Sequence, residues 1–94
     1  MIQSFTDEAT EAIFHGVYTH EIRRKFPSDV VQAAERKLDL LNGIDSLEGL
    51  HFIPSIGTQA VRDAHGKYSI PIDAEWRLAF RWNHGPSDLE LKNW

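Results

Sequence analysis

Apolar and cationic side chains alternate through the segment DAEWRLAFRW, residues 73–82, and this alternation constrains the fold more than any other feature. Successive side chains of a β-strand point to opposite faces, so residues two apart share a face. One face of the predicted strand carries four large apolar side chains, those of Trp76, Leu78, Phe80 and Trp82. The other face carries Arg77 and Arg81 with Ala79 between them. The segment therefore predicts a strand that buries one face and presents two arginines on the other.

Further strands are predicted on both sides of this one. The segment KYSIPID, residues 67–73, is joined to it by a tight polar turn, and NHGP turns the chain into a last strand, SDLELKNW. A short strand is also expected near residues 58–62. Pro71 has no N–H to donate, so its strand must leave that position unpaired at an edge or a bulge.

The clearest helical pattern lies in the middle of the chain. Ser28 is a good N-cap after Pro27, and apolar residues then recur at helical spacing until Asn42 and Gly43 supply a stop. This pattern predicts a helix over about residues 29–41, followed by a helical turn near residues 46–50.

The first 27 residues are less regular. The opening MIQSF suits a strand, and Thr6 is the expected cap of a brief helix that Gly16 ends. Residues 16–27 are interpreted as either a mobile loop or a frayed extension of a helix. Together these elements predict an α+β fold, an antiparallel β-sheet with two N-terminal helices packed on one face.

Length and composition limit the classes of protein. A chain of 94 residues favours a single domain over residues 1–94, and the absence of cysteine excludes disulfides and thiolate metal sites. The net charge of -4 argues against a generic polyanion binder. No secretory signal and no apolar run near the roughly 20 residues of a membrane span is present, so a cytoplasmic location and no membrane partner are expected.

The two arginines of the central strand have two interpretations. They are ordinary solvent-facing residues on the open side of a sheet, or they form an anion clamp, because a guanidinium group matches phosphate geometry. The hairpin RDAHGKYSI favours the clamp, since it brings Arg62, His65 and Lys67 within reach. His65 lies in a turn, where an imidazole can act as acid or base, although a plain polar turn residue is the simpler interpretation.

Other chemistries find little support in the sequence. His15 and His20 are five residues apart and do not form the i, i+4 pair of a helical zinc site, so neither a metal nor another cofactor is expected. No Gly-rich phosphate loop or nucleophile elbow is present. The triplet Arg23, Arg24 and Lys25 is either a solvated surface or a contact for RNA or a partner.

Three segments carry a resemblance to a known family. VVQAAERKLDLLNGIDSLEGL, HGKYSIPIDAEWRLAFRWNHGP and LELKNW resemble, in order and spacing, the host-inhibition-of-growth (HigB) toxins of the RelE superfamily. The resemblance covers residues 30–94, and MIQSF is similar to the family's start. It implies a RelE-like fold and the toxin of a type II toxin-antitoxin pair, an mRNA interferase that cuts messenger RNA without a metal, usually on the ribosome. A HigA-like helix-turn-helix antitoxin is the implied partner.

The resemblance also implies roles for single residues. Arg77 corresponds to the motif arginine that stabilises the crowded phosphate during cleavage. The predicted RNA-binding residues are all cationic: Arg62, Lys67, Arg81, Arg23, Arg24 and Lys25. Asn93 and Trp94 occupy the positions of the family's aspartate and tyrosine near its C-terminal histidine, but Asn93 cannot ionise and an indole only donates.

This departure leaves three hypotheses open. In the first, the cationic residues bind and cut RNA, His65 supplies proton transfer and Trp94 stacks on a base. In the second, the chain is a RelE-like module that holds the antitoxin or the ribosome without cutting RNA. In the third, the resemblance extends to the fold alone.

Overall fold

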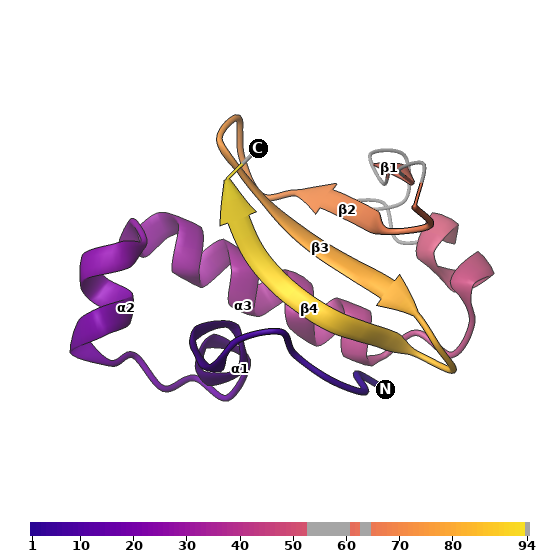
Figure 1. The fold of residues 1–94 in the computed structure, drawn as a ribbon, viewed down its shortest axis with the longest axis horizontal. Helices are drawn as coiled ribbons and strands as arrows, with labels where there is room; N and C mark the ends of the chain where they lie inside the picture. Colours follow the sequence, from indigo (N-terminus) through magenta and orange to yellow (C-terminus); the bar gives the residue numbers. More distant parts are fainter. Residues whose placement is uncertain (53–60, 63–64, 94) are drawn as a thin grey trace.

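The computed structural model describes residues 1–52, 61–62 and 65–93, which form an α+β arrangement (Figure 1). Its helices are α1 (Glu8–Phe14), α2 (His20–Lys25), α3 (Ser28–Asn42) and the 3₁₀ helix η1 (Leu47–Phe52). Its strands are β1 (Val61–Arg62), β2 (Tyr68–Pro71), β3 (Trp76–Trp82) and β4 (Pro86–Asn93). The strands form one antiparallel sheet in the order β1-β2-β3-β4. The predicted α+β class is therefore confirmed.

One face of the sheet packs on the helices. Figure 1 shows α3 running behind β3 and β4, with α1 beside the outer edge of β4. Leu78 and Phe80 are fully buried and join the side chains of α3 in one core, while Trp76 and Trp82 pack against its margin. Arg81, on the other face, is exposed. The two faces predicted from the alternation in β3 are thus confirmed.

The long helix α3 begins without a side-chain cap. Pro27 occupies the N-cap position, so Ser28 is the first helical residue and the predicted Ser28 cap is wrong. Proline serves here because its fixed φ matches the extended N-cap, with φ -60° and ψ 145°. Within the first turn, the Asp29 carboxylate accepts from its neighbour, the backbone N–H of Val30, at 2.9 Å. The predicted extent of the helix agrees with the observed one to within about one residue, as is usual for helix ends.

Helix α1 is capped by Asp7 rather than by the predicted Thr6. The Asp7 carboxylate accepts from the backbone N–H of Thr10 at 3.0 Å. Thr6 is engaged elsewhere, because its N–H and its hydroxyl both donate to the carbonyl of Leu89 in β4. The helix ends before Gly16, whose φ of 74° lies in the left-handed region that glycine tolerates best.

A third helix, α2, lies in the segment interpreted from sequence as a loop or a frayed extension. It has six residues, and the Thr19 hydroxyl caps it by accepting from the backbone N–H of Ile22 at 3.2 Å. Ile22 is its buried residue, and Phe26, just beyond its end, is also buried. Six residues are too few to show a helical repeat, so the prediction of two N-terminal helices is corrected to three.

Residues 3–6 form an N-terminal strap along the outer edge of β4. The N–H of Gln3 donates to Pro86 O, the N–H of Leu89 donates to Ser4 O, and a parallel bridge joins Phe5 to Leu89. The predicted opening strand is reduced to this single bridge. The reason is an irregularity in β4, where Asp88 adopts a φ of 52° and the register against β3 shifts.

The turn of the central hairpin follows the sequence prediction. Asp73 accepts from the N–H groups of Glu75 and Trp76 at 2.8 Å each, which closes the turn between β2 and β3. Pro71 is the last residue of β2 and pairs by register with Arg77 of β3, and the residues that would continue β1 beside it lie outside the described residues. Its carbonyl accepts from Lys37 Nζ of α3 at 2.6 Å, and partial burial lowers the pKa of Lys37. The strand predicted near residues 58–62 is seen only as β1, because residues 53–60 lie outside the described residues.

In the ranges that the structure describes, every helix is too short or too polar to cross a lipid bilayer.

The hydroxyl of Thr10 is expected to hold the C-terminal part of β4 against α1. Thr10 is fully buried, and its Oγ1 accepts from the N–H of Leu91 at 3.1 Å. Thr10→Val keeps the shape of the side chain but leaves this buried N–H without a partner, so we expect a loss of about 1–3 kcal/mol in the free energy of unfolding, measured with urea. Thr10→Ser retains the acceptor and should retain slow hydrogen exchange at the Leu91 amide. Equal exchange at this amide in both variants would contradict the assignment.

Candidate nucleic-acid interface

The sheet face opposite α3 collects positive charge. Register and alternation place the side chains of Arg77, Arg81 and Lys92 on this face, and Lys67 joins them through its contact with Glu90. No helix in the described part of the chain covers this face (Figure 1). We call the surface formed by Lys67, Arg77, Arg81, Glu90 and Lys92 the cationic face.

The two arginines of β3 stand at separate points of the cationic face. Four residues of strand place their Cα atoms about 13 Å apart. Arg77 is half-buried and pairs by register with Lys92, whereas Arg81 is exposed and pairs with Ser87. Ala79, which lies between them, is buried. This spacing suits contacts to different phosphates of one strand of RNA better than a single clamp on one phosphate.

The carboxylate of Glu90 lies near two ammonium groups of the cationic face. Its Oε1 lies 3.8 Å from Lys67 Nζ and 3.9 Å from Lys92 Nζ. By register it also pairs with Ala79, between the two arginines. These ion pairs are partly exposed, so each contributes little to stability, but the carboxylate orients both ammonium groups and lowers the local positive potential.

His65 lies at the Arg81 end of the cationic face. Its carbonyl oxygen accepts from Arg81 Nη1 at 3.2 Å, and its side chain is exposed. The turn is completed by Gly66, whose φ of 79° favours glycine. The structure thus brings His65 and Lys67 to this face, as predicted, but to the end near Arg81 and not to the end near Arg77.

Arg62 lies on the other side of the sheet from the two arginines of β3. It pairs by register with Tyr68, which pairs in turn with the buried Phe80. Its guanidinium carbon stands 5.7 Å from the centroid of the Tyr68 ring, a cation–π contact. The register at β1 thus puts Arg62 on the helix side, while its Nη2 still reaches the turn at Gly66, 3.6 Å from where a Cβ of that residue would lie.

Asn93 also belongs to the helix side of the sheet. It pairs with Trp76 at the end of β4, where Leu89 and Leu91 already point into the core. Trp94, the other predicted C-terminal site residue, lies outside the described residues. His65, the candidate for proton transfer, and Asn93 therefore lie at different ends of the sheet, and His65 stands at the Arg81 end.

The basic triplet lies on α2, in the helical layer. Arg23, Arg24 and Lys25 form the last turn of this helix, where positive charge is favourable next to the C-terminal end of the helix dipole. Lys25 Nζ stands 5.4 Å from the centroid of the Phe26 ring. These residues form a second cationic surface that is separate from the cationic face.

Glu90 and Lys92 were not predicted as site residues. A signal for them exists in LELKN, where Glu90 and Lys92 alternate with the apolar Leu89 and Leu91. The same period-2 pattern that identified the faces of β3 assigns both residues to the polar face of β4. The pairing of β3 with β4 then brings them beside the two arginines.

The side chains of the cationic face are of the kind that bind anions. Guanidinium and ammonium groups from three segments meet on a surface that no described helix covers, and such groups can stabilise phosphate charge. Among the described residues, no group of three His, Asp or Glu side chains is arranged to hold a metal ion. The face therefore offers charge stabilisation, while no described acid–base pair stands beside Arg77.

Comparisons with known proteins add no assignment. The chain matches no model of a known protein family, and no curated protein is significantly similar to it in sequence.

Removal of the carboxylate at the centre of the cationic face should strengthen binding of polyanions. We expect Glu90→Gln to bind a short single-stranded RNA more tightly at low salt, because Lys67 and Lys92 are released to contact phosphates. The slope of log affinity against log salt should steepen by about 0.7 for each additional phosphate that the protein neutralises.

Asp39→Asn is the matched control for this measurement, since Asp39 is exposed on α3 and its replacement changes the net charge equally. The same increase in affinity for both variants would show that net charge alone, and not the cationic face, governs binding.

Proposed function

We propose that the chain is a HigB-like toxin with a RelE-like fold, the toxin component of a type II toxin-antitoxin system that acts on messenger RNA. The observation that carries the proposal is the segregation of charge. Although the net charge of the chain is -4, its described residues place four cations together with Glu90 on the open face of the sheet. RNA phosphates bind to this face, and the resemblance in residues 30–94 supplies the class of substrate.

Arg77 is the residue proposed to meet the scissile phosphate. It follows Trp76 in the motif that resembles the HigB family, and Lys92 stands beside it by register. Trp76 makes an edge contact with Phe26 at 5.1 Å between centroids, which fixes the start of β3. Cleavage is metal-independent and takes place on the ribosome. It should be slow, because His65, the described candidate for proton transfer, stands at the Arg81 end of the face, and positioned acid–base groups are worth roughly 100- to 10,000-fold in rate.

A second function is favoured by a specific observation. His65 lies at the Arg81 end of the cationic face, and Asn93 lies on the helix side of the sheet. This separation favours a RelE-like module that holds RNA, the ribosome or a HigA-like antitoxin without cutting. Growth arrest with intact messenger RNA on expression of the chain would support this second function and count against the first.

The proposed role of Arg77 can be tested against Arg62, which carries the same charge on the other side of the sheet. Arg77→Gln should lower the rate of translation-dependent cleavage of a reporter messenger RNA by about 100- to 1000-fold, the usual loss for a donor that stabilises transition-state charge. Arg62→Gln should cleave nearly as well as the parent chain. Circular dichroism checks that both variants fold, and equal losses in the two would refute the assignment.

The position of the reaction can be tested through His65. Because its backbone contacts Arg81 and not Arg77, we expect His65→Ala to retain cleavage within about 10-fold, less than most general acid–base groups contribute. The readout is the rate of appearance of cut ends in the reporter RNA, with RNA affinity measured in parallel. A loss of several hundred-fold at unchanged affinity would move the reaction to the Arg81 end of the face.

A further inference from the structure

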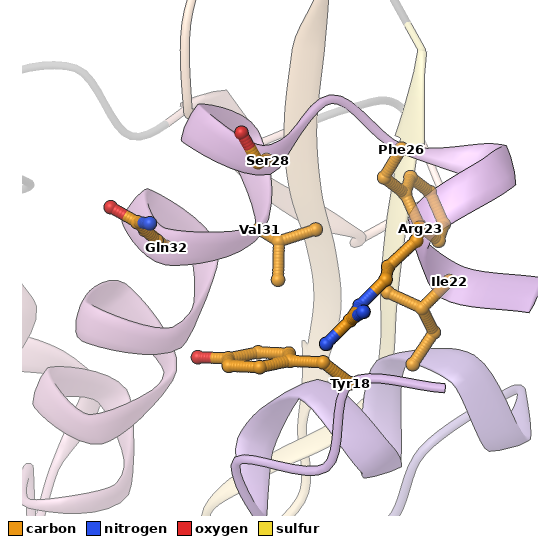
Figure 2. A pocket seen from close by; sticks show the side chains of 7 residues that line it. All are labelled: Tyr18, Ile22, Arg23, Phe26, Ser28, Val31 and Gln32. Carbon is orange, nitrogen blue, oxygen red and sulfur yellow. The ribbon is translucent and has the colours of Figure 1, made fainter. Parts of the chain in front are cut away.

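A groove lies between α2 and α3, in the helical layer and apart from the cationic face. Its volume is about 240 Å³, and Figure 2 shows the side chains of Ile22, Phe26 and Val31 pointing into it. All three of these side chains are buried against the core, so the apolar lining is held rigidly. The Tyr18 ring closes one side.

The volume of the groove limits what it can hold. Pockets for drug-sized ligands usually measure roughly 300–1,000 Å³, whereas an apolar cavity of about 150 Å³ accepts benzene. A groove of about 240 Å³ therefore accommodates one large apolar side chain, such as that of leucine or phenylalanine. Single side chains inserted in this way are typical anchors of peptide segments on protein surfaces.

The mouth of the groove is positively charged. The guanidinium group of Arg23 extends across the opening above the Tyr18 ring (Figure 2). Arg24 and Lys25 follow it on the same short helix. In the described ranges, none of these three cations has a carboxylate within ion-pair distance. A ligand with an apolar anchor and flanking carboxylates would complement both features.

We propose that this groove binds an acidic peptide segment of a partner protein, with one apolar side chain inserted against Ile22, Phe26 and Val31 and a carboxylate paired with Arg23. The inference is independent of the RNA chemistry on the sheet, since no residue of the groove belongs to the cationic face. It gives the basic triplet of α2 a role in binding a peptide, separate from phosphate binding on the sheet.

A carboxylate next to the groove, bonded to Tyr18 of its lining, argues for a peptide and against RNA at this surface. The Tyr18 hydroxyl donates to Glu35 Oε1 at 2.5 Å, and this hydrogen bond raises the pKa of Tyr18. A carboxylate thus stands at the α3 side while the cations stand at the α2 side. A continuous polyanion laid across the groove would meet Glu35, whereas a peptide can present its carboxylates to α2 alone.

The proposal is tested by NMR titration of the full chain with three blocked peptides of sequence EELEE, EESEE and KKLKK. EELEE should shift the backbone amide resonances of Ile22, Arg23 and Val31 at millimolar concentration or below. EESEE, which lacks the anchor, should bind about 10-fold more weakly, and KKLKK should not bind. Equal binding of EELEE and EESEE, or no shift with EELEE, would overturn the proposal.

Two arginine variants separate the groove from general electrostatics. Arg23→Gln should weaken EELEE binding by about 2- to 5-fold, as expected for an exposed ion pair. Arg36→Gln, an exposed position of α3 that does not line the groove, should leave it unchanged. Equal weakening in the two variants would count against the assigned pairing.

A titration with pentauridylate distinguishes a failure of the peptide proposal from a failure of the proposed RNA function. The RNA should shift resonances of the cationic face, such as those of Arg81 and Lys92, and not those of the groove. Shifts of the groove resonances by RNA but not by EELEE would overturn the peptide proposal. An absence of RNA binding with intact EELEE binding would leave the groove assignment standing and remove the function proposed for the sheet.

Discussion

The arrangement of the strands and helices depends on one constraint, the pairing of the backbone groups along the outer edge of β4. An exposed strand edge leaves backbone groups unpaired, and here the first ten residues satisfy them. The N-terminal strap pairs with Pro86 and Leu89, the Ser4 hydroxyl accepts from the N–H of Asp88 at 2.9 Å, and Thr10 accepts from Leu91. Backbone and side-chain hydrogen bonds therefore alternate along one edge. They fix β4 between the strap and β3, and with it the orientation of every side chain that β4 carries.

The fixed register of β4 separates two environments. Leu89 and Leu91 enter the core, while Glu90 and Lys92 reach the open face beside the residues of β3. Each of the paired segments contains only part of the positive charge on this face. Strand pairing brings these charges together, although the chain as a whole is acidic. The basic triplet, by contrast, is contiguous in sequence and belongs to the helical layer. The two surfaces can therefore serve different ligands without competing for the same residues.

Much of this arrangement is predictable from local pattern, and the failures have physical causes. The alternation in β3 predicts both faces of that strand, and the spacing in residues 29–41 predicts α3. Helix α2 is too short for periodicity, and its hydroxyl cap at Thr19 resembles an ordinary loop threonine. The side of the sheet on which Arg62 lies cannot be read from local pattern, because a shift of one residue in register reverses a strand's faces. Whether His65 approaches Arg77 or Arg81 depends on pairing between distant strands, which local pattern does not encode.

The strap also has a consequence for the order in which the chain acquires its structure. Its partners in β4 lie more than 80 residues away, so the strap and the Thr10 contact cannot form until β4 has left the ribosome during synthesis. Contacts between residues so far apart slow folding, because a long loop must close before they provide stabilisation. The open sheet face, to which β4 contributes Glu90 and Lys92, is therefore completed among the last steps of folding. During synthesis the nascent chain carries the arginines of β3 without the neighbours that organise them into a surface.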